Sequence, residues 1–527
     1  MKRILSGMLV FLVLFLEAAF GVVAQDGEAA GEHDEATCDQ VPIIYCEGAW
    51  HSLYSNAGTP QQEEFWNTGG GGDDIVSDLQ KLLPEFPKYI QNEEWDKIAD
   101  ILTDFVEALL SPIMFNSDGE SVAELDGDIN GMEQLLQQDH KADPSLREYD
   151  FNYDWREDPW VLAERFKNFL EQVCEKTGHS TVNVAAQSGS AVVFMAYLAR
   201  YKDENPLQHI RAITVRATLH KGSTVFGDLV NKRWHIDSEA LATTGFLRDF
   251  SVPNHEEISN MLLAADKTGL LKALLATVNR AWPRILDRLY ERAFVPYIMS
   301  LPMLWAYVPD EDYESGKEVC FGTNRGKYVN LIQKLDRYHY NVAVKADELL
   351  KDAAQKIRVG LYLGTNSPLF PLVENARRNS DGFVDTTLAS LGATVAEPFG
   401  KKLGVFGIYK QKLKSSHNYV SPDNTIDAST CLLRDYTWFI SDRPHIGGTN
   451  KNFAHWFFDS RKTQTVFSDP NYPQYLVFDD EQDIFVPQDE ESFLEKVGTA
   501  LNPVDRIKGF FYGIINFFIT LGTWWID

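Results

Sequence analysis

Ser188 lies where a β-branched, apolar run ends and a helical pattern begins. Residues 181–185 predict a strand, and residues 191–201 predict a helix. A serine held at such a sharp strand-to-helix turn can act as a nucleophile, as in the motif Gly-x-Ser-x-Gly. Ala186 and Ser190 occupy the two glycine positions, and both are small enough for the helix to pack close to the strand. The alternative is that Ser188 only caps the helix.

A serine nucleophile needs a histidine base, and the base needs a carboxylate that orients it. In hydrolases of this kind the three residues follow the chain order serine, acid, histidine. Asp381 begins an Asp-Gly loop signature downstream of a predicted strand at 357–364. His445 follows a predicted strand at 436–441. The order Ser188, Asp381, His445 therefore predicts a catalytic triad.

Other residues compete for the acid and base positions. Asp385 lies four residues beyond Asp381, and Asp427 lies in a turn-like segment. The other histidines considered are less well placed relative to the predicted strand ends, or lie among aromatic residues typical of a core: His51, His220, His417 and His455. The sequence alone leaves these alternatives open.

Acyl transfer also needs an oxyanion hole, in which two backbone N–H groups point at the developing negative charge. One donor is expected from Gly189, directly after the serine. The other is expected from the loop after an early predicted strand at 41–46, through Ala49, with Gly48 allowing the backbone to turn. The alternative is an ordinary turn at the end of that strand.

The elements that must position these residues alternate along the chain from residue 149, with strands predicted at 149–153, 181–185 and 210–218 and helices at 160–176 and 191–201. Such a β-α-β-α-β pattern predicts an α/β fold, with a mostly parallel sheet covered by helices on both faces. A mainly helical segment then separates this part from the strand at 357–364. We expect that segment to form a cap over the carboxyl ends of the strands, where open α/β sheets bind ligands. Its apolar residues fit either a core or an acyl-chain pocket.

The chain is thereby divided into six parts. The first begins with Met-Lys-Arg, continues with an apolar run and ends in small residues, which is typical of a secretory signal. We expect a signal peptide at 1–24, an acidic disordered leader at 25–40, a first core part at 41–227, a helical cap at 228–355, a second core part at 356–500 and a hydrophobic C-terminal helix at 501–527.

Composition narrows the possible partners. The 527 residues carry a formal net charge of −27, which argues against nucleic acid as a partner and is compatible with an acidic extracellular protein. Five cysteines show no paired metal spacing, and an Asp-Gly-Asp segment at 126–131 is interpreted as a turn rather than a calcium site. We expect no metal and no cofactor. Residues 509–526 fit either an interfacial membrane helix or a helix packed on the body.

The chain resembles the lecithin:cholesterol acyltransferase family, especially its exported bacterial-type members, over about residues 41–480. The most specific matching segment is Tyr153-Asp154-Trp155-Arg156 followed by Pro159. The others are residues 42–48, the turn at Ser188, residues 380–384 and Pro444-His445. The resemblance implies an α/β-hydrolase fold with a cap, acting on acyl esters of lipids. It implies the nucleophile Ser188, the acid Asp381, the base His445 and the oxyanion donors Ala49 and Gly189.

The chain departs from the family pattern around the serine. The family usually has Gly-His-Ser-x-Gly, whereas Gln187 replaces the histidine here and neither glycine is present. Glu47 replaces a common proline, and His51 replaces a common glycine. These changes leave the triad intact and bear on substrate preference and rate.

Together these observations predict a secreted serine acyl-ester hydrolase or O-acyltransferase that acts on lipids through an acyl-enzyme. The alternative is a hydrolase-fold protein that has lost turnover and serves surface-associated binding. The order of the triad favours the enzyme. The changes at Ala186, Gln187 and Ser190 favour the alternative.

Overall fold

A computed structural model gives the fold of the chain. It describes residues 40–46, 48, 51–57, 59, 61–66, 86–127, 130–243, 255–404, 411, 417–445, 448–460, 462–479 and 482–488. The expected signal peptide, the leader up to residue 39, the C-terminal helix at 501–527 and Ala49 lie outside these residues. No helix in the described part of the chain is long and apolar enough to cross a membrane.

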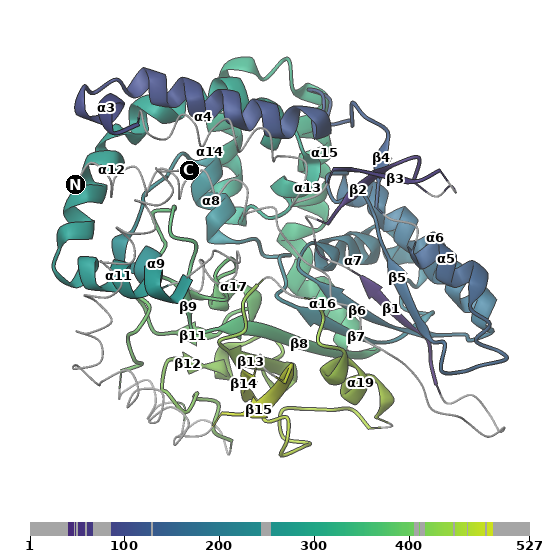
Figure 1. Ribbon diagram of the computed structural model, residues 1–527. Helices are drawn as coiled ribbons and strands as arrows, with labels where there is room; N and C mark the ends of the chain where they lie inside the picture. Colours follow the sequence, from purple (N-terminus) through teal and green to yellow (C-terminus); the bar gives the residue numbers. More distant parts are fainter. Residues whose placement is uncertain are drawn as a thin grey trace, which may run out of the picture.

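An eight-stranded sheet forms the centre of the molecule (Figure 1), in the order β15-β14-β13-β8-β7-β6-β1-β5. Every neighbouring pair is parallel except β14 and β15. The fold is therefore α/β, as predicted. The strands are β1 (Ile43–Cys46), β5 (Glu148–Phe151), β6 (Val182–Gln187), β7 (Ile210–Arg216), β8 (Arg358–Thr365), β13 (Thr437–Ser441), β14 (Tyr475–Asp479) and β15 (Ile484–Pro487).

Helices cover both faces of this sheet, which confirms the prediction. On one face, Val182, Val184 and Ala186 of β6 belong to the large apolar core that includes helices α6, α7 and α16. On the other face, Ala185 packs in a second cluster with aromatic residues of α19. Strands buried on both faces are typical of parallel sheets and explain the apolar runs in the sequence. These helices are α6 (Pro159–Thr177), α7 (Gly189–Arg200), α16 (Ala346–Ala354) and α19 (Lys451–Asp459).

A long helical segment connects β7 to β8 and lies above the sheet in Figure 1. Helix α4 (Trp95–Leu110), which comes much earlier in the chain, packs against α12 and η4 of this segment, where Arg288 and Arg292 pair with Asp100. The elements of the segment are α8 (Thr224–Val230), α9 (Ser238–Thr243), α11 (His255–Lys267), α12 (Leu270–Leu289), the π-helix η4 (Tyr290–Ile298), α13 (Pro302–Trp305), α14 (Asp310–Phe321), η5 (Gly322–Asn324), α15 (Val329–Asn341) and η6 (Ala343–Lys345).

Smaller elements complete the described fold. They are the three-stranded sheet of β2 (Leu53–Ser55), β3 (Glu63–Trp66) and β4 (Leu125–Asp126), the pairs β9 (Ser367–Pro368) with β10 (Asn379–Ser380) and β11 (Thr394–Val395) with β12 (Ile426–Asp427), and the helices α3 (Phe86–Gln91), η2 (Ser111–Ile113), α5 (Asn130–Gln137), η3 (Lys202–Glu204), α17 (Thr386–Ala389), η7 (Ala428–Thr430) and η8 (Arg434–Tyr436).

Two strand predictions need correction. The strand predicted at 436–441 is β13, but it is not the last, because β14 and β15 extend the sheet beyond it. Both are as short as the predicted strands β13 and β1, so their length does not explain why they were missed. The strand predicted at 210–218 ends at Arg216, because Ala217 adopts a φ of 46°, which turns the backbone away from the sheet.

Candidate active site

Ser188 forms a sharp turn between β6 and α7. Its backbone adopts φ 50° and ψ −117°, a combination that is strained for any residue with a side chain. The Ser188 side chain makes no capping hydrogen bond to α7. The alternative that Ser188 is only a helix cap is therefore wrong, because its hydroxyl is directed elsewhere.

Ser190 explains how the turn forms without the usual second glycine. Its side chain is buried, and its Oγ accepts a hydrogen bond of 2.8 Å from the backbone N–H of Gln187. The same hydroxyl lies 2.8 Å from the carbonyl oxygen of Cys46 at the end of β1, to which it donates. The Ser190 hydroxyl thus ties the turn to the neighbouring strand, a contact that glycine cannot make.

The three residues predicted as a triad meet in the structure. The Ser188 Oγ lies 2.9 Å from the Nε2 of His445, and the Nδ1 of His445 lies 2.9 Å from the Oδ2 of Asp381. Ser188 follows β6, Asp381 lies beyond β8 and His445 follows β13. Because these strands are parallel, their carboxyl ends meet at one edge of the sheet. Both contacts have the length of hydrogen bonds: the first can pass the Ser188 proton to His445, and the second orients the imidazole ring.

Asp381 is held as a carboxylate at the end of this chain of hydrogen bonds. It is only 2% exposed, and its Oδ1 accepts hydrogen bonds from the backbone N–H groups of Phe383 and Val384 at 3.0 and 2.8 Å. Burial alone would raise the pKa of the carboxyl group. The charge of His445 and the hydrogen bonds from His445 and the two amides outweigh burial and lower the pKa below its ordinary value.

The structure places the competing carboxylates elsewhere. The Oδ2 of Asp385 accepts a hydrogen bond of 2.8 Å from the backbone N–H of Thr224, at the start of α8. The Oδ1 of Asp427 accepts one from the backbone N–H of Ser429 and so caps a short helix. Both carboxylates have structural contacts, whereas Asp381 contacts His445.

The competing histidines are likewise engaged outside the triad. The ring of His51 contacts the carbonyl oxygens of Gly48 and Tyr153. His455 lies 2.8 Å from a carboxylate oxygen of Glu148. The other two are His417, which stacks on Phe467, and His220, which contacts the hydroxyl of Thr218.

The structure describes one of the two expected oxyanion donors, Gly189, and not the other, Ala49. Gly189 is the first residue of α7, and the first amide groups of a helix have no acceptor within the helix, so the helix leaves its N–H available to an anion. Ala49 lies outside the described residues. Its neighbour Gly48 lies against the nucleophile, since a Cβ added at Gly48 would be 3.4 Å from the Cβ of Ser188. Gly48 therefore lies next to the turn at Ser188.

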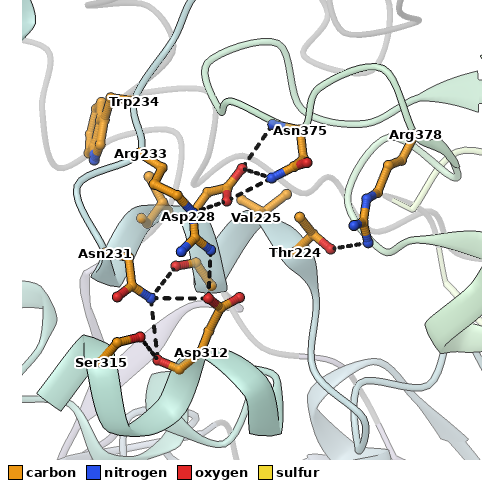
Figure 2. Close-up of polar contacts among 12 residues, drawn as sticks. Thr224, Val225, Asp228, Asn231, Arg233, Trp234, Asp312, Ser315, Asn375 and Arg378 are labelled. Atoms are coloured by element: carbon orange, nitrogen blue, oxygen red, sulfur yellow. Dashed lines mark hydrogen bonds and ion pairs between the residues drawn. The ribbon is translucent and has the colours of Figure 1, made fainter. Parts of the chain in front are cut away.

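A polar network joins the segment that carries Asp381 to α8 (Figure 2). The buried carboxylate of Asp228 accepts hydrogen bonds from the Nε of Arg233 at 2.7 Å and from the backbone N–H of Asn375 at 2.9 Å. Arg378 donates to the hydroxyl of Thr224 at 3.0 Å. Asn375 and Arg378 precede Asp381 in the chain, with the short strand β10 between Arg378 and Asp381. The helical segment therefore helps to set the position of the acid.

Sequence reasoning missed two groups at the site. The ring of Phe383 stacks on His445 with a centroid distance of 5.5 Å, and its backbone carbonyl accepts a hydrogen bond from Ser223. Arg216 contacts Gln187, which precedes Ser188, and Pro444, which precedes His445. The position of Phe383 two residues after Asp381 is a signal that could have been used, but nothing in the sequence around Arg216 marks it.

His220 predicts a pH dependence of folding. It is fully buried, and burial lowers its pKa from 6.5 to about 4. The unfolded chain therefore binds a proton as the pH falls below 6.5, while the folded chain does not until about pH 4. The stability present above pH 6.5 should fall by about 3 kcal/mol across this window.

The His220→Asn variant, which keeps a nitrogen near the Nδ1 position, should show a shallower decline in stability between pH 6.5 and 4. Urea unfolding at a series of pH values measures it. An unchanged slope in the variant would show that His220 does not stay neutral in the folded state.

Comparison with known proteins adds no assignment: no protein-family model and no curated protein matches the chain. Among the described residues, no group of three or more His, Cys, Asp and Glu side chains is placed to hold a metal ion.

Proposed function

We propose that the protein is a serine acyl-ester hydrolase or O-acyltransferase of the α/β-hydrolase fold. The observation that carries this proposal is the relay from Ser188 through His445 to Asp381, with 2.9 Å at each step. The strained backbone of Ser188 supports it further, because strain of this kind persists where a nucleophile must be exposed at a turn.

The proposed reaction has two half-reactions. The Nε2 of His445 takes the proton from Ser188 as its Oγ attacks the ester carbonyl, and the Gly189 amide stabilises the oxyanion. The imidazolium then gives its proton to the leaving alcohol, which leaves an acyl group on Ser188. Water or another alcohol enters, loses its proton to His445 and takes the acyl group, and the imidazolium returns that proton to the Ser188 Oγ as it leaves. Asp381 orients the Nδ1–H and stabilises the imidazolium throughout.

Lipid esters are the proposed substrates. The resemblance of the motifs to the lecithin:cholesterol acyltransferase family supports this class, and so do the aromatic side chains next to the base, where Phe226 and Phe370 contact the ring of Phe383. The signal-like start of the chain supports action outside the cell. The hydrophobic segment at 509–526 supports association with a membrane surface.

The test is labelling of the purified protein with a fluorophosphonate, followed by hydrolysis of p-nitrophenyl esters of increasing acyl length. We expect one label at Ser188 and faster turnover with longer chains. Adding a lipid alcohol and measuring acylated product then separates a transferase from a hydrolase. A folded protein, checked by circular dichroism, that takes no label would contradict the enzyme and favour the binding protein. That alternative draws on the replacement of both glycines at the turn.

A further inference from the structure

Arg216 is a buried arginine at the carboxyl end of β7. It is 1% exposed and lies directly opposite Gln187 in the pairing of β7 with β6. Its own backbone carbonyl accepts a hydrogen bond of 2.9 Å from the N–H of Ser188. Arg216 is therefore adjacent to the nucleophile through its backbone, and its side chain extends from the same point.

The guanidinium group of Arg216 joins two segments that are far apart in the sequence. Its Nη1 donates to the Oε1 of Gln187 at 3.2 Å, and its Nη2 donates to the carbonyl oxygen of Pro444 at 2.6 Å. Gln187 immediately precedes Ser188, and Pro444 immediately precedes His445. One planar group thus contacts the residue before the nucleophile and the residue before the base.

Gln187 extends this connection to the loop after β1. A Cβ placed on Gly48 would lie 3.5 Å from the Nε2 of Gln187, so the amide packs directly against that loop. The loop after β1, the turn at Ser188 and the segment that carries His445 therefore share one set of contacts centred on Arg216. This arrangement also gives a role to Gln187, which replaces the histidine usual in the family.

The shape of the guanidinium group explains why arginine suits this position. A second buried arginine, Arg443, lies close enough that burial and the charge of Arg216 together lower its pKa to about 10. A planar fork that holds two acceptors at fixed directions is what arginine offers and lysine does not.

We propose that Arg216 is a positioning residue that sets the separation of the Ser188 Oγ and the His445 Nε2 through Gln187 and Pro444. The inference rests on the proposed acyl-transfer function. A displacement of about 1 Å between reacting groups can lower a rate by about 100-fold. The contacts predict that loss of the guanidinium lowers kcat and leaves substrate binding largely intact.

The experiment compares Arg216→Met, Arg216→Lys, Gln187→Leu and Gln187→Glu in hydrolysis of a p-nitrophenyl ester. We expect Arg216→Met and Gln187→Leu to lower kcat by about 10- to 100-fold with KM changed less than about threefold. Lysine should restore part of the loss, because one ammonium group reaches one acceptor. Glutamate should retain most activity, because its carboxylate still accepts from Arg216. The double variant Arg216→Met/Gln187→Leu should lose little more activity than either single variant, since both substitutions break the same contact between Arg216 and Gln187.

Arg147→Lys is the matched control. Arg147 is also buried and donates two hydrogen bonds, of 2.7 and 2.8 Å, to Asp459, but it precedes β5 at the opposite edge of the sheet. Its replacement should lower the melting temperature and leave kcat unchanged. A second readout is the low-field proton NMR signal of the His445 Nδ1–H, which should shift or broaden in Arg216→Met and persist in Arg147→Lys.

The outcomes separate the two proposals. If the wild-type protein takes no fluorophosphonate label, the proposed function fails, whatever the variants show. If the wild type is labelled but Arg216→Lys and Gln187→Leu keep wild-type kcat and an unchanged NMR signal, the positioning role is overturned. If Arg216→Met does not fold, those two milder variants decide the question in the same way.

Discussion

Replacing Ser188 with alanine should lower ester hydrolysis by about four to six orders of magnitude and abolish fluorophosphonate labelling. The Oγ of Ser188 is the atom placed 2.9 Å from the Nε2 of His445, and alanine removes it without changing the fold. A steady-state assay with the purified variant measures the loss. Turnover that survives in the alanine variant would show that another group attacks the ester.

Glycine at the same position separates the role of the hydroxyl from the strain of the backbone. At φ 50° and ψ −117° a side chain is unfavourable, whereas glycine adopts this region readily. Ser188→Gly should be as inactive as the alanine variant but more stable by about 1 kcal/mol, after the larger chain entropy of glycine is subtracted. Thermal unfolding of the two inactive variants side by side measures the difference. A glycine variant less stable than the alanine variant would show that a side chain at position 188 does not strain the backbone.

Asp381→Asn should lower kcat by about 10⁴-fold. The carboxylate accepts the hydrogen bond from the Nδ1 of His445, so the Nε2 is left free to take the proton of Ser188. An asparagine amide can donate to Nδ1 instead, which stabilises the wrong tautomer. The kcat of the variant, measured at a pH where the wild type is fully active, checks this expectation.

Asp385→Asn is the matched control, since Asp385 is on the same loop and equally buried. Its carboxylate accepts from Thr224 and is paired with Arg378 rather than with the histidine. We expect the unfolding free energy to fall by about 1–2 kcal/mol and kcat to change only severalfold. Equal losses of kcat in the two variants would mean that the acid is not assigned correctly.

Asp381 and Asp385 also show where sequence reasoning stops. Both follow the same strand, and both are acidic residues in a polar loop. Their positions in the sequence therefore do not decide which of them is the acid of the triad. The backbone amides of Phe383 and Val384 turn Asp381 toward His445, while Asp385 reaches the first turn of α8. That choice depends on α8, whose position follows from packing rather than from the loop.

The fold was predictable to the extent that its elements are long and regular. The strands β1, β5, β6, β7, β8 and β13 and the helices α6 and α7 were predicted within a few residues, because the strands are apolar runs and the helices carry an apolar face. The strands β14 and β15 were missed, although they are as long as β13 and β1, so their length does not explain the difference. The packing of α4 on the helices of the later segment was also invisible in the sequence.

By itself the sequence determined the α/β alternation and the small-residue turn that holds Ser188, because both are set by local sterics and by the period of apolar residues. Only the tertiary structure decided that Asp381 and His445 complete the relay. It also decided that Arg216 contacts the residues that precede Ser188 and His445. These groups are brought together across as many as 257 residues of chain. The direction of a loop side chain over such a span is set by the packing of the elements on either side, not by the residues next to it.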